Sequence, residues 1–171
     1  EARFDITPYV KTGTNLIALE IFRWCDGTYL EDQDFWRLTG LARDTYIFSR
    51  EKKRIEDIRV VASASGKAEI YAEVSKGISS VAFSIIDPAG NEVASEVVAV
   101  KNSDRSDRGL PYVNTVLEIA SPKLWSAETP WLYTLKVASF DKQGQTEKTS
   151  INIGFRDVCI KDGLLLVNGK P

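Results

Sequence analysis

Residues 67–100 read KAEIYAEVSKGISSVAFSIIDPAGNEVASEVVAV, and the alternation of apolar and polar residues in this stretch predicts a β fold. In 67–75 the apolar set alternates with charged and polar residues, as expected for a strand with one buried face. The segments 80–86 and 92–100 flank the turn sequence Asp87-Pro88-Ala89-Gly90-Asn91. This arrangement predicts two antiparallel strands joined as a hairpin.

Further segments with the same pattern lie on both sides of this stretch. They are residues 55–63, 113–119, 132–140 and 145–155. About seven short antiparallel strands in a domain of roughly 100 residues are typical of an immunoglobulin-like β-sandwich. The Cys-Trp-Cys spacing of antibody domains is missing, so the sequence predicts the sandwich architecture alone. The charged segment 101–109 has the composition of an exposed loop.

The first 50 residues predict a smaller and incomplete β unit. Strands are expected at 4–10, 15–24 and 43–51. Three strands bury too little apolar area to form a stable sheet alone. The charged run 49–57 is the expected linker to the sandwich. Since the chain starts within a strand pattern and has no Met, we expect it to be a piece of a longer protein.

The last residues, 158–171, predict a short hairpin followed by a second tight turn. Asp162-Gly163 and Asn168-Gly169 are dipeptides that favour two-residue turns with positive φ angles. The fold class predicted for the whole chain is therefore all-β.

Composition excludes several classes of function. Lys and Arg number 22 against 24 Asp and Glu, and this net charge of -2 gives no reason to expect nucleic acid or a membrane surface as partner. No His is present, which excludes catalysis by Ser-His-Asp or Cys-His groups and metal sites based on His. Cys25 and Cys159 are expected to be buried free thiols. The compartment, cytoplasmic or periplasmic, stays open.

The segment RWCDGTYLEDQDFWR, residues 23–37, places four carboxylates among four aromatic rings, and three interpretations compete. Glu31, Asp32 and Asp34 could provide the two carboxyl groups of a glycoside hydrolase. A hard cation could instead take oxygens from this cluster, which comprises Asp26, Glu31, Asp32, Gln33 and Asp34.

The third interpretation of residues 23–37 is structural. Asp26-Gly27 would be a turn, and Trp24 and Trp36 would be core aromatics. The acidic side chains would then pair with Arg23 and Arg37. Apolar ring faces beside carboxylates suit a carbohydrate ligand better than a phosphate. Residue types and spacing do not decide between a catalyst and a binding site.

A family resemblance adds to these interpretations. Residues 23–47, RWCDGTYLEDQDFWRLTGLARDTYI, resemble the end of the amino-terminal jelly-roll, sugar-binding domain of the bacterial β-galactosidases of glycoside hydrolase family two. SPKLWSAETPWLYTL (121–135) is similar to the last third of that family's immunoglobulin-like domain. IGFRDVCIKDGLLLVNGKP (153–171) is similar to the lead into its TIM barrel.

The resemblance implies three parts of the chain. Residues 1–51 would be the carboxy-terminal part of the jelly-roll domain, and 52–155 the immunoglobulin-like domain. Residues 156–171 would lead into a TIM barrel that is absent from this chain. The implied parent enzyme hydrolyses terminal β-D-galactosides with retention. Its catalytic glutamates lie on the barrel, so the resemblance implies no catalytic residue and no activity for this chain alone.

The resemblance also implies a role for two aspartates. Asp34 corresponds to the acid that helps to hold Na⁺ and meets the 6-hydroxyl of galactose, and Asp26 to a ligand of a peripheral Mg²⁺. A carboxylate can serve both a hard cation and a sugar hydroxyl. We expect neither ion to be bound by the isolated chain. The expected partners are the β-galactoside and the barrel domain.

Two other interpretations stay open. The chain could be a stand-alone carbohydrate-binding module with its site at Trp24, Tyr29, Asp34 and Trp36. The sandwich alone could act as a spacer between domains, with Trp125 and Trp131 filling its core. Uncovered strand edges within 1–50 would favour self-association.

Overall fold

The computed structural model describes residues 3–31, 40–41, 43–101 and 103–171. The chain divides into two compact units, Glu1–Phe48 and Ser49–Pro171. The second unit carries all the β structure of the described residues, and the first carries the one short helix, α1 (Thr28–Glu31). Nothing helical in the described part of the chain has the length and hydropathy that a membrane crossing requires.

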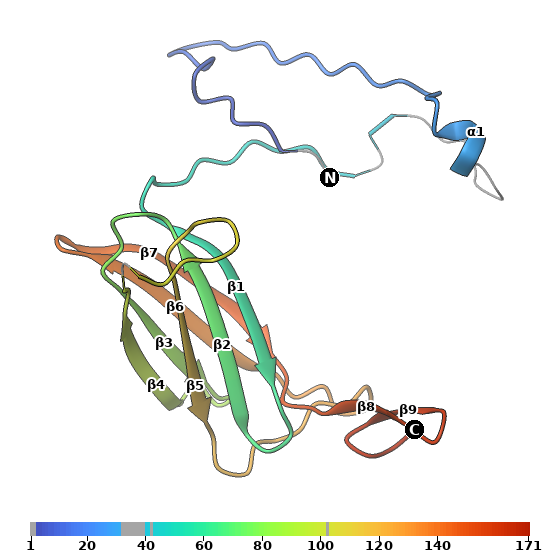
Figure 1. Ribbon diagram of the computed structural model, residues 1–171, viewed down its shortest axis with the longest axis vertical. Coiled ribbons are helices and arrows are strands. Elements are labelled where there is room, and N and C mark those ends of the chain that lie inside the picture. The colour runs from blue at the N-terminus through green and yellow to red at the C-terminus, as the bar shows by residue number, and fades with distance from the viewer. Residues whose placement is uncertain (1–2, 32–39, 42, 102) are drawn as a thin grey trace. The chain divides into compact units, whose positions relative to one another are not determined.

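The second unit contains two antiparallel sheets, which Figure 1 shows stacked on each other. The first sheet has the order β1-β2-β5, with β1 Ile55–Ala62, β2 Lys67–Val74 and β5 Tyr112–Glu118. The second has the order β4-β3-β6-β7, with β3 Ser80–Ile86, β4 Glu92–Ala99, β6 Tyr133–Asp141 and β7 Gly144–Ile153. These seven strands confirm the predicted β-sandwich. In constant-type immunoglobulin domains the fourth strand joins the first sheet, whereas here β4 pairs with β3.

The core lies between the two sheets and is built by the alternation in the sequence. On β2 the predicted inward residues Ala68, Ile70, Ala72 and Val74 are all buried, and β3 contributes Val81, Phe83 and Ile85. Full burial of one large aliphatic or aromatic side chain stabilises a fold by roughly 1.5–3 kcal/mol. At one end the rings of Tyr133 and Phe155 meet edge to face with centroids 5.1 Å apart.

The turn predicted at 87–91 joins β3 and β4, and Asp87 holds it together. Oδ1 of Asp87 accepts hydrogen bonds from the backbone N–H groups of Ala89 (2.9 Å) and Asn91 (2.8 Å). Gly90 has a φ of 92°, a conformation that glycine adopts without strain. The pKa of Asp87 is lowered, mainly by the hydrogen bond from the Asn91 side chain to Oδ2 (3.1 Å) and then by the bond from the Asn91 backbone.

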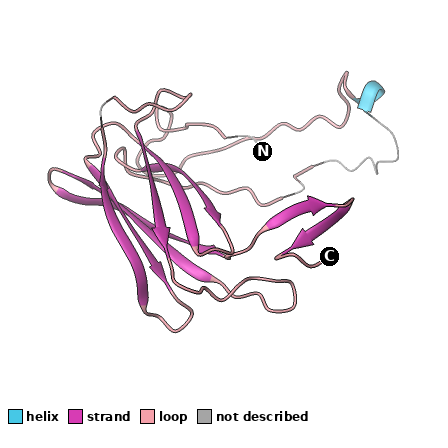
Figure 2. Cartoon of the chain, turned by 60° about the horizontal axis from the view of Figure 1, so that its bottom comes forward, coloured by secondary structure: helices cyan, strands magenta, loops and turns pink. Residues whose placement is uncertain are grey.

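The carboxy-terminal hairpin is also confirmed. It pairs β8 (Val158–Lys161) with β9 (Leu164–Val167) in antiparallel register, as Figure 2 shows. Asp162 and Gly163 have φ angles of 52° and 77°, and Asn168 and Gly169 have 51° and 77°. Two successive positive φ angles are the signature of the tight turn that each dipeptide predicted. Most apolar side chains of the hairpin are exposed, including Ile160 (78%) and Leu165 (62%).

Several sequence-based predictions are wrong. The strands predicted at 4–10, 15–24 and 43–51 are absent, since the described residues there contain turns, bends and extended chain but no strand. A strand forms only where a neighbour pairs its backbone groups, and side chains such as Leu16 (95% exposed) find no core here.

Trp131 is 41% exposed and lies outside the core, beside Lys123, whose Nζ is 4.2 Å from the ring centroid. Cys25 and Cys159 are free, as expected, but exposed.

Candidate functional site

The segment predicted to form the site is described only in its first part. Residues 23–31 are described, while Asp32, Asp34 and Trp36 lie outside the described residues. The predicted contacts of Asp34 with a cation and a sugar hydroxyl therefore stay predictions.

The described part forms a turn that leads into α1. The backbone N–H of Thr28 donates to the carbonyl of Cys25 (3.0 Å), and Oγ1 of Thr28 accepts from the N–H of Cys25 (3.1 Å). Asp26 and Gly27 occupy the turn between them, as predicted. This geometry leaves Asp26 exposed, so its carboxylate is open to solvent and to a cation.

Trp24 is 51% exposed, so its interpretation as a core aromatic is wrong. The guanidinium carbon of Arg23 lies 5.2 Å from the centroid of the Trp24 ring. A guanidinium over an indole face is a favourable cation–π contact. An exposed indole beside a charged group is also the kind of surface on which a sugar ring can stack.

Asp26 does not make a metal site by itself. Among the described residues, no group of three or more Asp, Glu, Cys or His side chains is placed to share an ion. Mg²⁺ requires near-octahedral oxygen ligands and Ca²⁺ six to eight, of which one carboxylate supplies one or two. Hard carboxylate oxygens fit such a cation chemically, but Asp26 can only complete a site whose other ligands come from elsewhere.

A second polar site, which the sequence did not reveal, lies on the outer face of the three-stranded sheet. It is an open hollow of about 620 Å³. The residues that line it come from β1, β2, β5 and the loop before β5: Asp57, Arg59, Tyr71, Glu73, Arg105, Ser106, Asp107, Arg108, Tyr112 and Asn114. Its aromatic part consists of Tyr71 and Tyr112, whose ring centroids are 5.1 Å apart, with the guanidinium of Arg59 4.3 Å from the Tyr71 ring.

Glu73 is the buried charge of this hollow, with only 4% of its surface exposed. Its carboxylate accepts a hydrogen bond of 3.0 Å from the Tyr71 hydroxyl and another from Arg108. Burial by itself would raise the pKa of Glu73, but the hydrogen bonds from Tyr71, Arg108 and Ser106 outweigh it and lower the pKa. The pKa of Tyr71 is raised, first by burial and then by the neighbouring carboxylate. Glu73 is therefore an ionised anchor for the loop that carries Arg108.

The burial of Glu73 could not be predicted from the sequence. It occupies an outward position in the alternation of β2, where a charged residue predicts exposure. The cover comes from a loop about 35 residues later, and no local pattern connects the two. Arg108 itself is exposed, as predicted for 101–109.

Two protein-family models match the chain. The model of the glycosyl hydrolases family 2 matches residues 53–156, and that of the family's sugar binding domain matches residues 1–51. The chain belongs to glycosyl hydrolase family 2. The match at 53–156 covers the whole β-sandwich, and that at 1–51 covers the segment with Asp26 and Asp34.

Relatives within family 2 include bacterial β-galactosidases. The chain is 36% identical to the β-galactosidase of Aeromonas hydrophila subsp. hydrophila over 179 residues, and 35% identical to that of Photobacterium profundum. Each alignment covers 99% of this chain and 17% of the relative. The chain thus spans about a sixth of the length of these relatives, and the resemblance to β-galactosidases is confirmed.

Solved structures of two β-glucuronidases share the fold. A β-glucuronidase from Ruminococcus gnavus, solved with D-glucaro 1,5-lactone, matches with a TM-score of 0.54 at 22% identity. The β-D-glucuronidase of Dictyoglomus thermophilum matches with a TM-score of 0.54 at 25% identity. Each match covers 70% of this chain and 18–19% of the other chain.

Proposed function

We propose that the chain is a non-catalytic portion of a β-galactosidase that hydrolyses terminal β-D-galactosides with retention. The observation that carries this proposal is the 35–36% identity to β-galactosidases over 99% of the chain. The structural match to β-glucuronidases is weaker in sequence, at 22–25% identity, and extends over 70% of the chain. The balance favours a galactoside as the substrate of the whole enzyme.

In this proposal Asp34 forms part of one wall of the galactose site. Its carboxylate would ligate Na⁺ and accept a hydrogen bond from a sugar hydroxyl, two roles that suit a hard, charged acceptor. Asp26, exposed on the turn before α1, would give one ligand to Mg²⁺. The half-exposed Trp24 adds an apolar face close to Asp26 in sequence.

The remaining parts of the chain would support the catalytic barrel. Two carboxyl groups about 5–5.5 Å apart perform retaining hydrolysis, one as nucleophile and one as acid and base. We assign neither role to a residue of this chain. The exposed apolar side chains of the β8–β9 hairpin, such as Ile160 and Leu165, would pack against the barrel. The sandwich would hold the two neighbouring domains apart at a fixed distance.

The test is an assay of the 171-residue polypeptide with an aryl β-galactoside. We expect no hydrolysis by this polypeptide, and full activity only for an enzyme that also contains the barrel. Turnover by the 171 residues that disappears in Asp34→Asn would contradict the proposal. Asp44→Asn, which removes another carboxylate from the same unit, serves as the control.

A second candidate function is a stand-alone carbohydrate-binding module, which the exposure of Trp24 favours. Calorimetry of the isolated chain with galactose or lactose separates the two candidates. Millimolar or tighter binding that Trp24→Ala abolishes supports the module. If no heat of binding is measured, the result favours the proposed non-catalytic role within a larger enzyme.

A further inference from the structure

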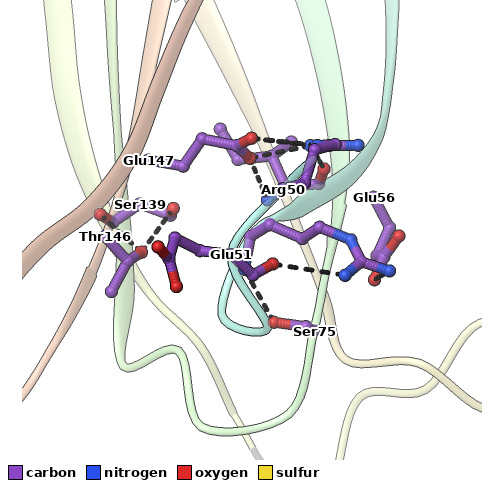
Figure 3. Close-up of polar contacts among 9 residues, drawn as sticks. Arg50, Glu51, Glu56, Ser75, Ser139, Thr146 and Glu147 are labelled. Carbon is purple, nitrogen blue, oxygen red and sulfur yellow. Dashed lines mark hydrogen bonds and ion pairs between the residues drawn. The ribbon is translucent and has the colours of Figure 1, made fainter. Parts of the chain in front are cut away.

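We propose that Glu147 clamps the charged connector, residues 49–54, onto the sandwich, so that this segment is a fixed strap that leads into β1. The composition of 49–57 predicted a linker. Figure 3 shows instead that Arg50 and Glu147 face each other where the strap passes β7. This inference does not depend on the substrate of the whole enzyme.

The carboxylate of Glu147 bonds both to the Arg50 side chain of the strap and to the backbone of Ile55 at the start of β1. Arg50 donates from Nη2 to both carboxylate oxygens at 2.8 Å and from Nε to Oε1 at 3.1 Å. Oε2 also accepts the backbone N–H of Ile55, the first residue of β1, at 2.7 Å. The guanidinium of Arg50 donates in addition to the carbonyl of Ile55. One carboxylate therefore joins the strap, β1 and β7.

These contacts are shielded enough to hold. The side chains of Arg50 and Glu147 are 34% and 23% exposed, so water competes only partly for their hydrogen bonds. Charge-assisted bonds between a guanidinium and a carboxylate are about twice as strong as neutral ones and fix the geometry of both groups. Ile55 is itself buried, at 3% exposure, so the clamp ends on a residue of the core.

Lys53 provides a second attachment. Its ammonium group donates to Asp141 at the β6–β7 turn, where the Asp141 side chain is only 7% exposed. Asp141 also accepts the N–H groups of Gln143 (2.7 Å) and Gly144 (3.1 Å). The ion pair with Lys53 is the main cause of a lowered pKa of Asp141. The anchor is thus itself held in place by the turn.

Arg54 is tied to the loop after β2. Its N–H donates to Oγ of Ser75 at 2.8 Å, and the N–H of Ser75 donates to the carbonyl of Arg54 at 2.9 Å. The Arg54 side chain donates to the carbonyl of Glu51 at 3.2 Å and pairs with Glu56 at 3.1 Å. Three of the six strap residues therefore bond to other parts of the sandwich.

The basic residues of the strap allow a direct test, because each is a cleavage site for trypsin. Arg50, Lys52, Lys53 and Arg54 would be cut quickly in a mobile linker, since exposed flexible segments are preferred sites of proteolysis. A clamped strap is protected. Cleavage after Lys52 is the best readout, because Lys52 is not one of the clamp residues and its side chain is exposed.

We therefore compare the wild-type chain with Glu147→Ala in limited digestion with trypsin, followed by mass spectrometry. The variant should be cut after Lys52 about tenfold faster, because loss of the charge-assisted bonds favours the open strap. Amide exchange of Ile55 should accelerate similarly. Glu118→Ala is the matched control, since its pair with Lys67 is exposed on both sides and should leave both rates unchanged.

Equal rates after Lys52 and at the Ile55 amide in wild type and Glu147→Ala would overturn the proposal. Cleavage after Arg59, inside β1, reports global unfolding, so its rate must stay that of wild type for the comparison. If Glu147→Ala unfolds, Arg50→Gln removes the side-chain bonds of the clamp and leaves the bond between the Ile55 N–H and Glu147 in place. In that variant, Lys52 must again become sensitive, and continued protection would overturn the proposal equally.

Discussion

The hydroxyl group of Tyr71 donates a hydrogen bond of 3.0 Å to the buried carboxylate of Glu73, two residues further along β2. Residues two apart on a strand lie on the same face, so this pair forms on the outer face of the sheet. Arg108 reaches the same carboxylate from the loop before β5. A strand and a remote loop are thereby joined at one charge, which is 4% exposed.

Removing the donor should weaken the sandwich. We expect Tyr71→Phe to lower the free energy of unfolding by about 1 kcal/mol, since a buried acceptor then loses one partner. Urea denaturation followed by fluorescence measures the change. Tyr112→Phe is the control, because the structure shows no hydrogen bond from the Tyr112 hydroxyl to a described residue. Equal effects of the two variants would contradict the assigned role of the Tyr71–Glu73 bond.

Acid should destabilise the sandwich through three carboxyl groups. Folding lowers the pKa of Glu73, Asp87 and Asp141 from ordinary values of 4.5, 3.8 and 3.8. A lowered folded-state pKa contributes stability above the unfolded value, and this stability is lost as the pH falls through the folded value. We therefore expect the free energy of unfolding to be steady near neutrality and to fall below about pH 4.5.

Asp87→Asn tests this pH dependence at one site. The amide keeps an oxygen for the turn but no longer titrates, so the acid slope should be smaller than in wild type. Denaturation series between pH 7 and the acid limb measure the slope. An unchanged slope would show that the Asp87 turn does not contribute to acid sensitivity.

Two glycines share the same φ angle but differ in their surroundings. Substituting each one separates the cost of backbone strain from the cost of steric crowding. Gly66 and Gly90 both have a φ of 92°. A β-carbon on Gly66 would lie 2.1 Å from the Ile119 carbonyl oxygen, while one on Gly90 would meet nothing within 4 Å. Gly90→Ala should cost about 1 kcal/mol from the positive φ alone. Gly66→Ala should cost a further 1–3 kcal/mol or so, because the backbone of Ile119 must move.

The difference between these two variants in urea denaturation is the relevant measurement. Equal losses would mean that the approach of Gly66 to Ile119 is looser than the structure shows. The bond from the Ile119 N–H to the Gly66 carbonyl, at 2.9 Å, argues for a close approach.

The sandwich could be predicted from the sequence because short local patterns of residues indicate its strands and turns. Alternation in 67–74 and 80–86 identified strands and their inward faces, and Asp87 to Asn91 identified the turn. The burial of Glu73 depends on a remote loop, and Trp131 lies outside the core with 41% of its surface exposed. Neither follows from a pattern of residue types. For Asp34 the prediction rests on a motif, and that residue lies outside the described structure.

The exposed apolar side chains of the first unit should cause self-association. Leu16 is 95% exposed and Phe22 75% exposed, and side chains this apolar are favourable to bury between two chains. We expect the mass from light scattering to rise with protein concentration, and more steeply in ammonium sulfate, which strengthens apolar burial. Leu16→Ser should reduce the rise, while Val97→Ser on β4, 67% exposed in wild type, should not. A hundredfold range of concentration spans about 2.7 kcal/mol of association free energy. A monomer mass that stays constant over this range would contradict the expected self-association.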